Sequence, residues 1–371
     1  MRILQLGKFY PIRGGVEKVM YDLMLGLSEK GIDCDMMCTT LDNRKGEVRL
    51  NANARLILCR TLFVLAATTF SPMLVWRLRR MCNRYDIIHV HHPDPMAALA
   101  LFLSGYRGKV VLHWHSDVLK QRLLLPFFMP LQNWIINRAD TIVGTTQTYV
   151  ESSPFLEKVK HKLEALPIGV EEVAPSTKEV DNIKNKYQGK KIVYSIGRLV
   201  EYKGYTHLID AASHLTDEYV ILIGGDGKLR DSLQQQINNN GLSQRVKLLG
   251  LLSDMHRDAL YGAADIFCLS SVQKTEAFAI VQIEAMSCGT PIVATNIPGS
   301  GVPWVNEHSV SGINVEPENG KALAEAIMQI CESKEVYDRF AQNAKMRYAT
   351  QFTYERMIDD CIAIYGRIGV V

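Results

Sequence analysis

Two glutamates, Glu276 and Glu284, bracket a segment whose residue types suit the binding of a phosphorylated ligand. A buried-strand pattern, Asp265–Leu269, precedes Glu276, and a helix-like stretch that ends near Gly289 and Pro291 follows it. This pattern predicts Glu276 in a loop at the carboxyl end of a strand and Glu284 about two turns into a helix. Between them lies a helix N-terminus, whose free backbone N–H groups are a natural seat for a phosphate.

The spacing of the two glutamates also fits other sites. A solvated helix face can carry glutamates eight residues apart. An acid–base pair of a glycosidase needs carboxylates on two sides of one sugar, whereas one strand–turn–helix presents both along a line. The neighbouring motifs therefore decide the interpretation.

Two cations, Arg198 and Lys203, lie in the loop Gly197–Gly204, which follows another buried strand and opens a helix. Arginine offers a bidentate fork for phosphate oxygens and lysine a compact charge, so together they could neutralise a diphosphate leaving group. The alternative is a pair of solvated loop charges. Gly225, in the turn Ile223–Gly227, is expected beside a nucleotide.

Adjacent glycines, Gly14 and Gly15, close the loop after the first strand, and a helix opens at Val16. They would let the backbone approach an anion at a helix N-terminus. The loop has neither the Gly-Lys-Ser/Thr of a Walker A motif nor the G-x-G-x-x-G of a dinucleotide site. The second absence argues against a nicotinamide dehydrogenase.

Histidines end two neighbouring strands of the first half. His115 ends one of them and is expected to face the ligand, while His89, His91 and His92 crowd the end of the other. A metal site is an alternative, but strand alternation points His91 and His92 to opposite faces, so we expect no metal. The D-x-D of Asp33–Asp35 lies at a strand start and is interpreted as structural.

Strands alternate with helices along the whole chain, in two series of about 170 residues each. This alternation predicts an α/β protein with two doubly wound Rossmann-like domains, 1–168 and 169–352, that face a central cleft. Ligands of open parallel sheets bind beyond the strand carboxyl ends, so the site is expected in that cleft.

The composition is that of a soluble globular protein, with 47% hydrophobic and 22% charged residues in 371. The start, Met1–Gly7, is a strand and a glycine turn, not a signal peptide. The longest apolar run, Thr61–Trp76, is interrupted by Ser71-Pro72 and is too short to span a bilayer. Eight scattered cysteines indicate reduced thiols in the cytoplasm.

Positive charge is concentrated in the first half, where residues 1–168 contain 22 basic and 14 acidic residues although the whole chain is only +3. Arg77, Arg79, Arg80 and Arg84 follow the apolar run. No aromatic residues interleave with them, which argues against single-stranded nucleic acid as a partner. An anionic membrane surface is favoured, and a core-facing helix with a solvated basic edge is the alternative.

Together these motifs resemble the retaining glycosyltransferases of the GT-B fold, in glycosyltransferase family 4. The resemblance covers nearly the whole chain, and its most specific part is the paired glutamates with the following Glu-Ala-Met-x-x-Gly-x-Pro. The family has glycine where Ala279 stands. The resemblance implies that a last helix, 353–371, crosses back onto the acceptor-side domain 1–168, and that 169–352 binds the nucleotide-sugar.

The resemblance also implies a role for each motif. Arg198 and Lys203 would bind the donor diphosphate, Glu284 the ribose hydroxyls, and His115 the donor sugar near the reacting centre. Glu276 and the following backbone would hold the sugar and diphosphate. The implied catalytic residues are His115, Arg198, Lys203 and Glu276, and the further donor-binding residues are Gly14, Gly15, Gly225, Phe278, Ala279, Ile280 and Glu284.

The expected activity is transfer of a hexose from a nucleotide-sugar, with GDP-mannose favoured, to a lipid-linked glycan of a bacterial O-antigen or capsule. No metal cofactor is expected, and the place of action is the inner face of the cytoplasmic membrane. Lys120 and Arg122 are the expected acceptor-binding residues. The alternatives are a UDP-sugar donor, a UDP-N-acetylglucosamine 2-epimerase, and a catalytically silent sugar-nucleotide-binding protein. The oligomeric state is left open.

Overall fold

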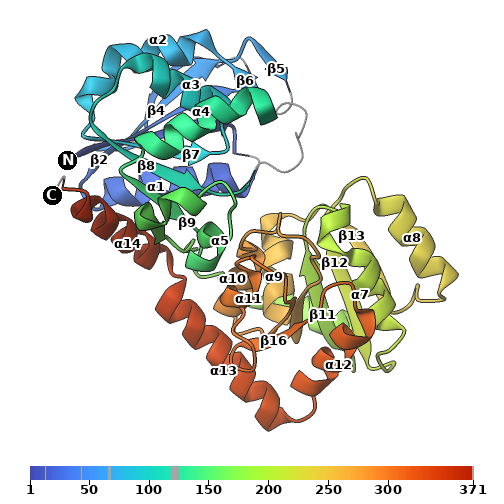
Figure 1. Ribbon diagram of the computed structural model, residues 1–371. Coiled ribbons are helices and arrows are strands. Elements are labelled where there is room, and N and C mark those ends of the chain that lie inside the picture. Colours follow the sequence, from blue (N-terminus) through green and yellow to red (C-terminus); the bar gives the residue numbers. More distant parts are fainter. Residues whose placement is uncertain (13, 43, 66–67, 118–124, 370–371) are drawn as a thin grey trace. The chain divides into compact units, whose positions relative to one another are not determined.

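The computed structural model describes residues 1–369 apart from residues 13, 43, 66–67 and 118–124 (Figure 1). Contacts within the chain divide it into two compact units. The first unit comprises Met1–Ile168 and Tyr354–Val371, and the second unit comprises Gly169–Thr353. Lys120 and Arg122, the expected acceptor-binding residues, lie outside the described residues.

The first unit is an α/β structure in which strands and helices mostly alternate. Its elements are β1 (Arg2–Tyr10), α1 (Gly15–Glu29), β2 (Asp33–Thr40), β3 (Gly46–Arg49), β4 (Arg55–Arg60), β5 (Phe63–Leu65), β6 (Thr68–Phe70), α2 (Pro72–Met81), β7 (Ile87–His92), α3 (Pro95–Ser104), β8 (Lys109–Trp114), α4 (Leu125–Arg138), β9 (Thr141–Gly144), α5 (Gln147–Glu151), β10 (Leu163–Ala165) and α14 (Tyr354–Arg367).

Eight strands of the first unit form one sheet in the order β10-β9-β8-β7-β1-β2-β4-β3. All pairs are parallel except β3 with β4. The chain builds outward from β1 on one side and from β7 on the other, so the strand order reverses between them. Loops at the carboxyl ends of β1 and β7 therefore diverge, which leaves room for a ligand at this edge.

The apolar run Thr61–Trp76 divides into two structures that the sequence did not distinguish. Its first part is a separate antiparallel hairpin of β5 and β6. Its second part is helix α2, which begins after the N-cap Ser71 and buries Leu74 and Leu78. The core-facing alternative therefore describes α2, whereas β5 is exposed along its whole length.

The C-terminal helix α14 belongs to the first unit, where it packs against α1 (Figure 1). The contact is close because α1 has a glycine there: a Cβ added to Gly26 would lie 2.6 Å from Ile358. Lys30 and Asp359 form an ion pair of 2.7 Å at the edge of the same contact. Tyr365 of α14 is completely buried, so this helix contributes to the interior of the first unit.

The second unit repeats the same alternation around a six-stranded parallel sheet, in the order β13-β12-β11-β14-β15-β16. Its elements are α6 (Thr177–Lys186), β11 (Lys191–Ile196), α7 (Tyr205–Ala212), β12 (Tyr219–Gly224), α8 (Arg230–Asn239), β13 (Val246–Gly250), α9 (Asp254–Ala263), β14 (Ile266–Leu269), α10 (Ile280–Ser287), β15 (Ile292–Thr295), α11 (Val302–Val305), β16 (Gly312–Val315), α12 (Gly320–Ile330) and α13 (Lys334–Gln351).

The strand order of the second unit reverses between β11 and β14. Both strands are buried on both faces, which explains their nearly continuous apolar sequences. The prediction of two Rossmann-like α/β domains with parallel sheets is confirmed. None of the described helices combines the length and the apolar composition that crossing a bilayer requires.

Candidate functional site

The loops that follow β11 and β14 meet at the strand-order reversal of the second unit. The N–H of Val272 donates to the carbonyl of Tyr202 at 2.8 Å, and the Ser270 hydroxyl donates to the Lys203 carbonyl at 3.0 Å. Gly204 is left-handed (φ 63°), and a Cβ there would lie 2.1 Å from the Ser270 carbonyl oxygen. Only glycine allows this approach, which fixes one loop against the other.

An ion pair joins the two loops. The Lys203 ammonium lies 2.5 Å from Oε2 of Glu276, and each residue is only 9% exposed. The Ser271 hydroxyl donates to the same carboxylate oxygen at 2.9 Å, and the Ser300 hydroxyl donates to the Glu276 carbonyl. The structure thus brings two of the predicted catalytic residues into direct contact. The sequence did not predict this contact, nor the two serines that hold the glutamate.

Arg198 precedes this ion pair in the same loop and is exposed. Its Nη2 donates to the Tyr202 hydroxyl at 3.2 Å. Gly225 (φ 117°) packs directly against this loop, because an added Cβ would lie 2.0 Å from the Gly197 carbonyl oxygen. Gly225 therefore allows the turn after β12 to pack against the backbone beside Arg198.

Helix α10 begins at Ile280, so a helix N-terminus does lie between the two glutamates, as predicted. Phe278 and Ala279 are buried, which fits a segment whose backbone faces the ligand. The expected position of Glu284 was wrong: it lies little more than one turn into α10, not two. The physical reason is that the loop after β14 extends to Ala279, so fewer residues are left for the helix.

Ala279 adopts the left-handed conformation (φ 62°) at the N-cap of α10. An L-residue with a Cβ pays about 1–2 kcal/mol for this conformation, and glycine does not. Glycine also loses more chain entropy on folding, about 0.5–1 kcal/mol. We therefore expect Ala279→Gly to raise the free energy of unfolding by up to about 1 kcal/mol, measured by urea denaturation. A loss of stability would show that the Ala279 methyl group packs favourably enough to offset the strain.

Glu284 accepts a hydrogen bond of 2.6 Å from the hydroxyl of Tyr261, a buried residue of α9. Burial, followed by the charge of Glu284, raises the pKa of Tyr261 well above its usual value. The phenol therefore keeps its proton and donates a hydrogen bond to the carboxylate, which fixes the direction of the Glu284 side chain. Tyr261 carried no sequence signal, because it comes from a different helix.

In the first unit, Gly14 is the N-cap of α1, and both Gly14 and Gly15 are exposed. A Cβ added to Gly14 would lie 2.7 Å from Oε2 of Glu17, so the Glu17 carboxylate folds back over the helix start. A carboxylate in this position stabilises the positive end of the helix. A phosphate that approached the glycines would meet it. No motif singled out Glu17 beforehand.

His115 ends a chain of buried hydrogen bonds that runs across the first unit. Its Nε2 is 2.9 Å from Nδ1 of His91, whose Nε2 is 2.8 Å from Oε1 of Gln5. The Gln5 amide nitrogen is 3.3 Å from the Tyr365 hydroxyl, which is 2.7 Å from Nδ1 of His89. Through Tyr365, the C-terminal helix α14 takes part in the hydrogen-bond network that ends at His115. The two residues are more than 200 positions apart in the sequence.

The chain of hydrogen bonds fixes the position of the His115 proton. Burial lowers the pKa of His91 and of His115 well below 6.5, so each neutral ring carries one N–H. Oε1 of Gln5 can only accept, so His91 donates from Nε2 and accepts at Nδ1. His115 then donates from Nε2, and its Nδ1 is left as an acceptor.

The metal-site alternative centred on His89, His91 and His92, whereas the histidine nitrogens that lie within 4.8 Å of one another belong to His89, His91 and His113. Their rings are stacked almost parallel, with angles of 13–28° between planes. Because a histidine lone pair lies in its ring plane, stacked rings do not converge on one ion. Both nitrogens of His91 are also engaged in hydrogen bonds. The predicted alternation is confirmed, since His92 stacks instead on Trp114, at 3.9 Å between centroids.

The D-x-D of the first unit is structural, as predicted. Asp35 is buried, forms an ion pair of 2.6 Å with Arg55 and accepts a hydrogen bond of 2.7 Å from the Tyr85 hydroxyl. Both carboxylate oxygens contact Arg55, so the side chain is held by its neighbours.

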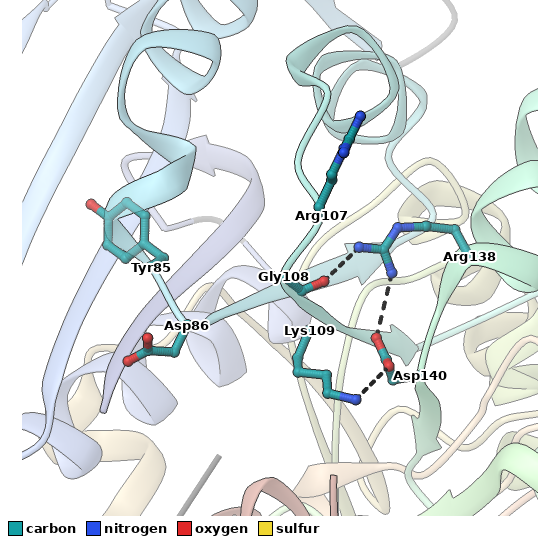
Figure 2. Close-up of a pocket in the computed structure, with 7 residues that line it drawn as sticks. All are labelled: Tyr85, Asp86, Arg107, Gly108, Lys109, Arg138 and Asp140. Carbon is teal, nitrogen blue, oxygen red and sulfur yellow. Dashed lines mark hydrogen bonds and ion pairs between the residues drawn. The ribbon is translucent and has the colours of Figure 1, made fainter. Parts of the chain in front are cut away.

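A pocket of about 390 Å³ lies at the amino ends of the strands of the first sheet, where β8 and β9 begin (Figure 2). Asp140 forms ion pairs there with Lys109 at 3.1 Å and with Arg138 at 3.4 Å. Figure 2 shows that Arg138 also reaches the Gly108 carbonyl, at 2.5 Å. These contacts tie the strand starts together, and the pocket contains none of the predicted site residues.

Two family models match the chain. Residues 13–171 match the model described as Glycosyltransferase Family 4, and residues 176–347 match Glycosyl transferases group 1. The chain is 30% identical over 369 residues to "O-antigen chain mannosyltransferase C" of Escherichia coli, with 98% of each chain covered. It is 28% identical to "D-rhamnosyltransferase WbpZ" of Pseudomonas aeruginosa, over 95% of this chain and 92% of the relative.

Solved structures share the fold. The crystal structure of Anabaena HepE in complex with UDP superimposes with a TM-score of 0.79 at 21% identity, covering 99% of this chain and 100% of that one. Sucrose-phosphate synthase from Thermosynechococcus elongatus has a TM-score of 0.81 at 18% identity, with 99% of each chain covered. At these identities the likeness concerns the arrangement of the backbone.

Proposed function

Because this chain belongs to the family 4 glycosyltransferases and has the GT-B fold, we propose that it transfers mannose from GDP-mannose to a lipid-linked glycan of a bacterial O-antigen. The choice of sugar is supported by the 30% identity to the O-antigen chain mannosyltransferase, which extends over 98% of both chains. The second relative is a D-rhamnosyltransferase. D-Rhamnose is 6-deoxy-D-mannose, so both names describe sugars of the manno configuration.

The observation that carries the proposal is the Lys203–Glu276 ion pair beside Arg198, at the strand-order reversal of the second unit. An ammonium has three N–H donors, so Lys203 can keep its bond to Glu276 while it donates to a phosphate. Arg198 is exposed and has a planar fork of donors. Together they would neutralise the GDP that forms as the sugar leaves.

The proposed reaction retains the anomeric configuration. The bond between the sugar C1 and the diphosphate oxygen breaks, and the acceptor hydroxyl bonds to C1 on the same face. The hydroxyl proton passes to the departing diphosphate oxygen, so GDP is the other product and no side chain forms a covalent intermediate. Charge neutralisation by Arg198 and Lys203 takes the place of a metal ion in this scheme.

The remaining predicted residues orient the donor. Nδ1 of His115 would accept a hydrogen bond from a sugar hydroxyl, since its neutral ring carries the proton on Nε2. Glu284 would accept from the ribose hydroxyls, with its direction fixed by Tyr261. Gly14 and Gly15 would supply backbone close to the donor. We place the reaction at the cytoplasmic face of the inner membrane, where a lipid-linked acceptor would be met.

The test is thermal denaturation with GDP-mannose, UDP-glucose, UDP-galactose, UDP-N-acetylhexosamines and the free nucleotides. A ligand at about 100 times its Kd stabilises the folded state by about 2.7 kcal/mol. We expect stabilisation by GDP and GDP-mannose only. Stabilisation by the UDP compounds alone would replace the proposal with its UDP-sugar alternative. The anomeric configuration of the product, read by NMR, tests retention.

Arg198→Ala is expected to abolish stabilisation by GDP and to lower kcat/KM by about 100- to 1,000-fold, as for the loss of one charge-stabilising donor. Its melting temperature without ligand should stay unchanged, because Arg198 is exposed. The matched control is Lys321→Ala, which removes an exposed cation of α12 in the same unit. Equal GDP stabilisation in Arg198→Ala and wild type would contradict the proposed site.

A further inference from the structure

The hairpin of β5 and β6 presents a run of exposed apolar side chains. Leu62, Phe63, Val64 and Leu65 are consecutive and are 53–64% exposed. Single exposed apolar residues are ordinary on a protein surface, but a contiguous run of this size marks an interaction site. The proposed chemistry does not use these residues.

Contacts within the hairpin hold its two strands together, and a hydrogen bond joins it to the main sheet of the first unit. The N–H of Leu62 donates to the Phe70 carbonyl at 2.8 Å, and the rings of Phe63 and Phe70 stack with centroids 4.7 Å apart. The Thr69 hydroxyl is 2.7 Å from that of Thr39 in β2, which ties the hairpin to the main sheet. The apolar side chains are therefore presented by an ordered element that leads directly into α2 (Figure 1).

Positive charge flanks the apolar run along the sequence, although Arg55 and Arg77 form ion pairs with carboxylates. Residues 48–85 contain seven arginines and no acidic residue. Arg79 and Arg80 are exposed on the last turn of α2, and the Arg80 guanidinium lies 4.1 Å from the ring centroid of Trp76, which is also exposed. Tryptophan and arginine are the residues that proteins place at the headgroup level of a bilayer. The surface therefore fits a partner that is both apolar and anionic.

We propose that the β5–β6 hairpin inserts into an anionic lipid bilayer, with Trp76, Arg79 and Arg80 at the headgroups. Strands of three residues extend about 10 Å, which matches the 5–10 Å to which interfacial elements enter the acyl boundary and is far too short to span it. The inference rests on the proposed function in one respect: a lipid-linked acceptor is met at such a surface.

The test is co-sedimentation of the full chain with vesicles of phosphatidylcholine alone or mixed with phosphatidylglycerol. Val64→Ser/Leu65→Ser should lower the partition coefficient about 10- to 100-fold, because two apolar side chains no longer leave water. Arg79→Gln/Arg80→Gln should lower it roughly 25-fold on the anionic vesicles only, since each arginine near such a surface contributes about fivefold. The matched control is Leu251→Ser/Met255→Ser, which removes two exposed apolar side chains of the second unit.

Stabilisation by GDP and turnover with a water-soluble acceptor should be unchanged in the hairpin variant, so failure of the donor assignment and failure of the hairpin assignment are separately visible. Vesicle binding that is equal in Val64→Ser/Leu65→Ser and wild type would overturn the proposal. Sedimentation velocity gives a second outcome that would overturn the proposal. If wild type self-associates and Val64→Ser/Leu65→Ser does not, the surface joins two copies of the chain. Equal binding to both vesicle types would overturn the requirement for anionic lipid.

Discussion

Lowering the pH from 7.5 to 5.5 is expected to reduce the free energy of unfolding of the first unit by as much as about 7 kcal/mol. The cause is a group of five buried histidines in that unit. Burial lowers the pKa of His113 to about 3 and the pKa of the other four well below 6.5; these four are His89, His91, His92 and His115.

The direction follows from where protons bind. In the unfolded chain each imidazole returns to a pKa near 6.5, so below that pH the unfolded chain binds protons that the folded unit excludes. Stability is therefore complete above about pH 7 and is lost as the pH falls through 6.5. A histidine that stays neutral over the whole interval contributes about 1.4 kcal/mol, so five contribute at most about 7 kcal/mol, which is comparable to the whole stability of many domains.

Urea denaturation at pH 7.5, 6.5 and 5.5, followed by tryptophan fluorescence, measures this effect. Three of the four tryptophans, Trp76, Trp114 and Trp134, belong to the first unit, and Trp304→Phe removes the fourth. His113→Phe keeps a ring in the stack but removes one titrating group, so it should reduce the pH dependence by about 1.4 kcal/mol. His161→Gln, at an exposed histidine of the same unit, is the control. A stability that does not change between pH 7.5 and 5.5 would mean that the folded histidines accept protons.

Lys203→Met is expected to destabilise the second unit by about 3–5 kcal/mol, because it leaves the buried Glu276 carboxylate without its cation. Lys203→Met/Glu276→Gln removes both charges and should recover most of that stability. Urea denaturation followed by circular dichroism compares the three proteins. A single variant as stable as wild type would show that solvent reaches Glu276 and compensates its charge.

The same two variants separate stability from chemistry. Neither retains the Lys203 ammonium, so we expect kcat/KM to fall about 100-fold or more in both, although only one of them is unstable. Assays at a temperature where all three proteins are folded make the comparison fair. Wild-type activity in the double variant would show that the ion pair serves only to hold the two loops together.

The strand order decided which predicted residues meet. Periodicity and glycine turns in the sequence located β11 and β14 and the polar loops that follow them. They could not show that these two strands are neighbours, because β12 and β13 intervene in the chain. The contact between Lys203 and Glu276 depends on that order, so it became visible only in the folded sheet.

What the sequence by itself determined is local: two series of alternating strands and helices, a helix start between Glu276 and Glu284, and the family, which its motifs indicate and the comparisons bear out. What only the tertiary structure decided is non-local. Tyr365 reaches His89 across 276 residues, and the apolar run after Thr61 divides into an exposed hairpin and a helix that faces the core. The physical reason is that backbone preferences and side-chain periodicity act over a few residues, whereas partners for buried polar groups are chosen by the packing of the whole unit.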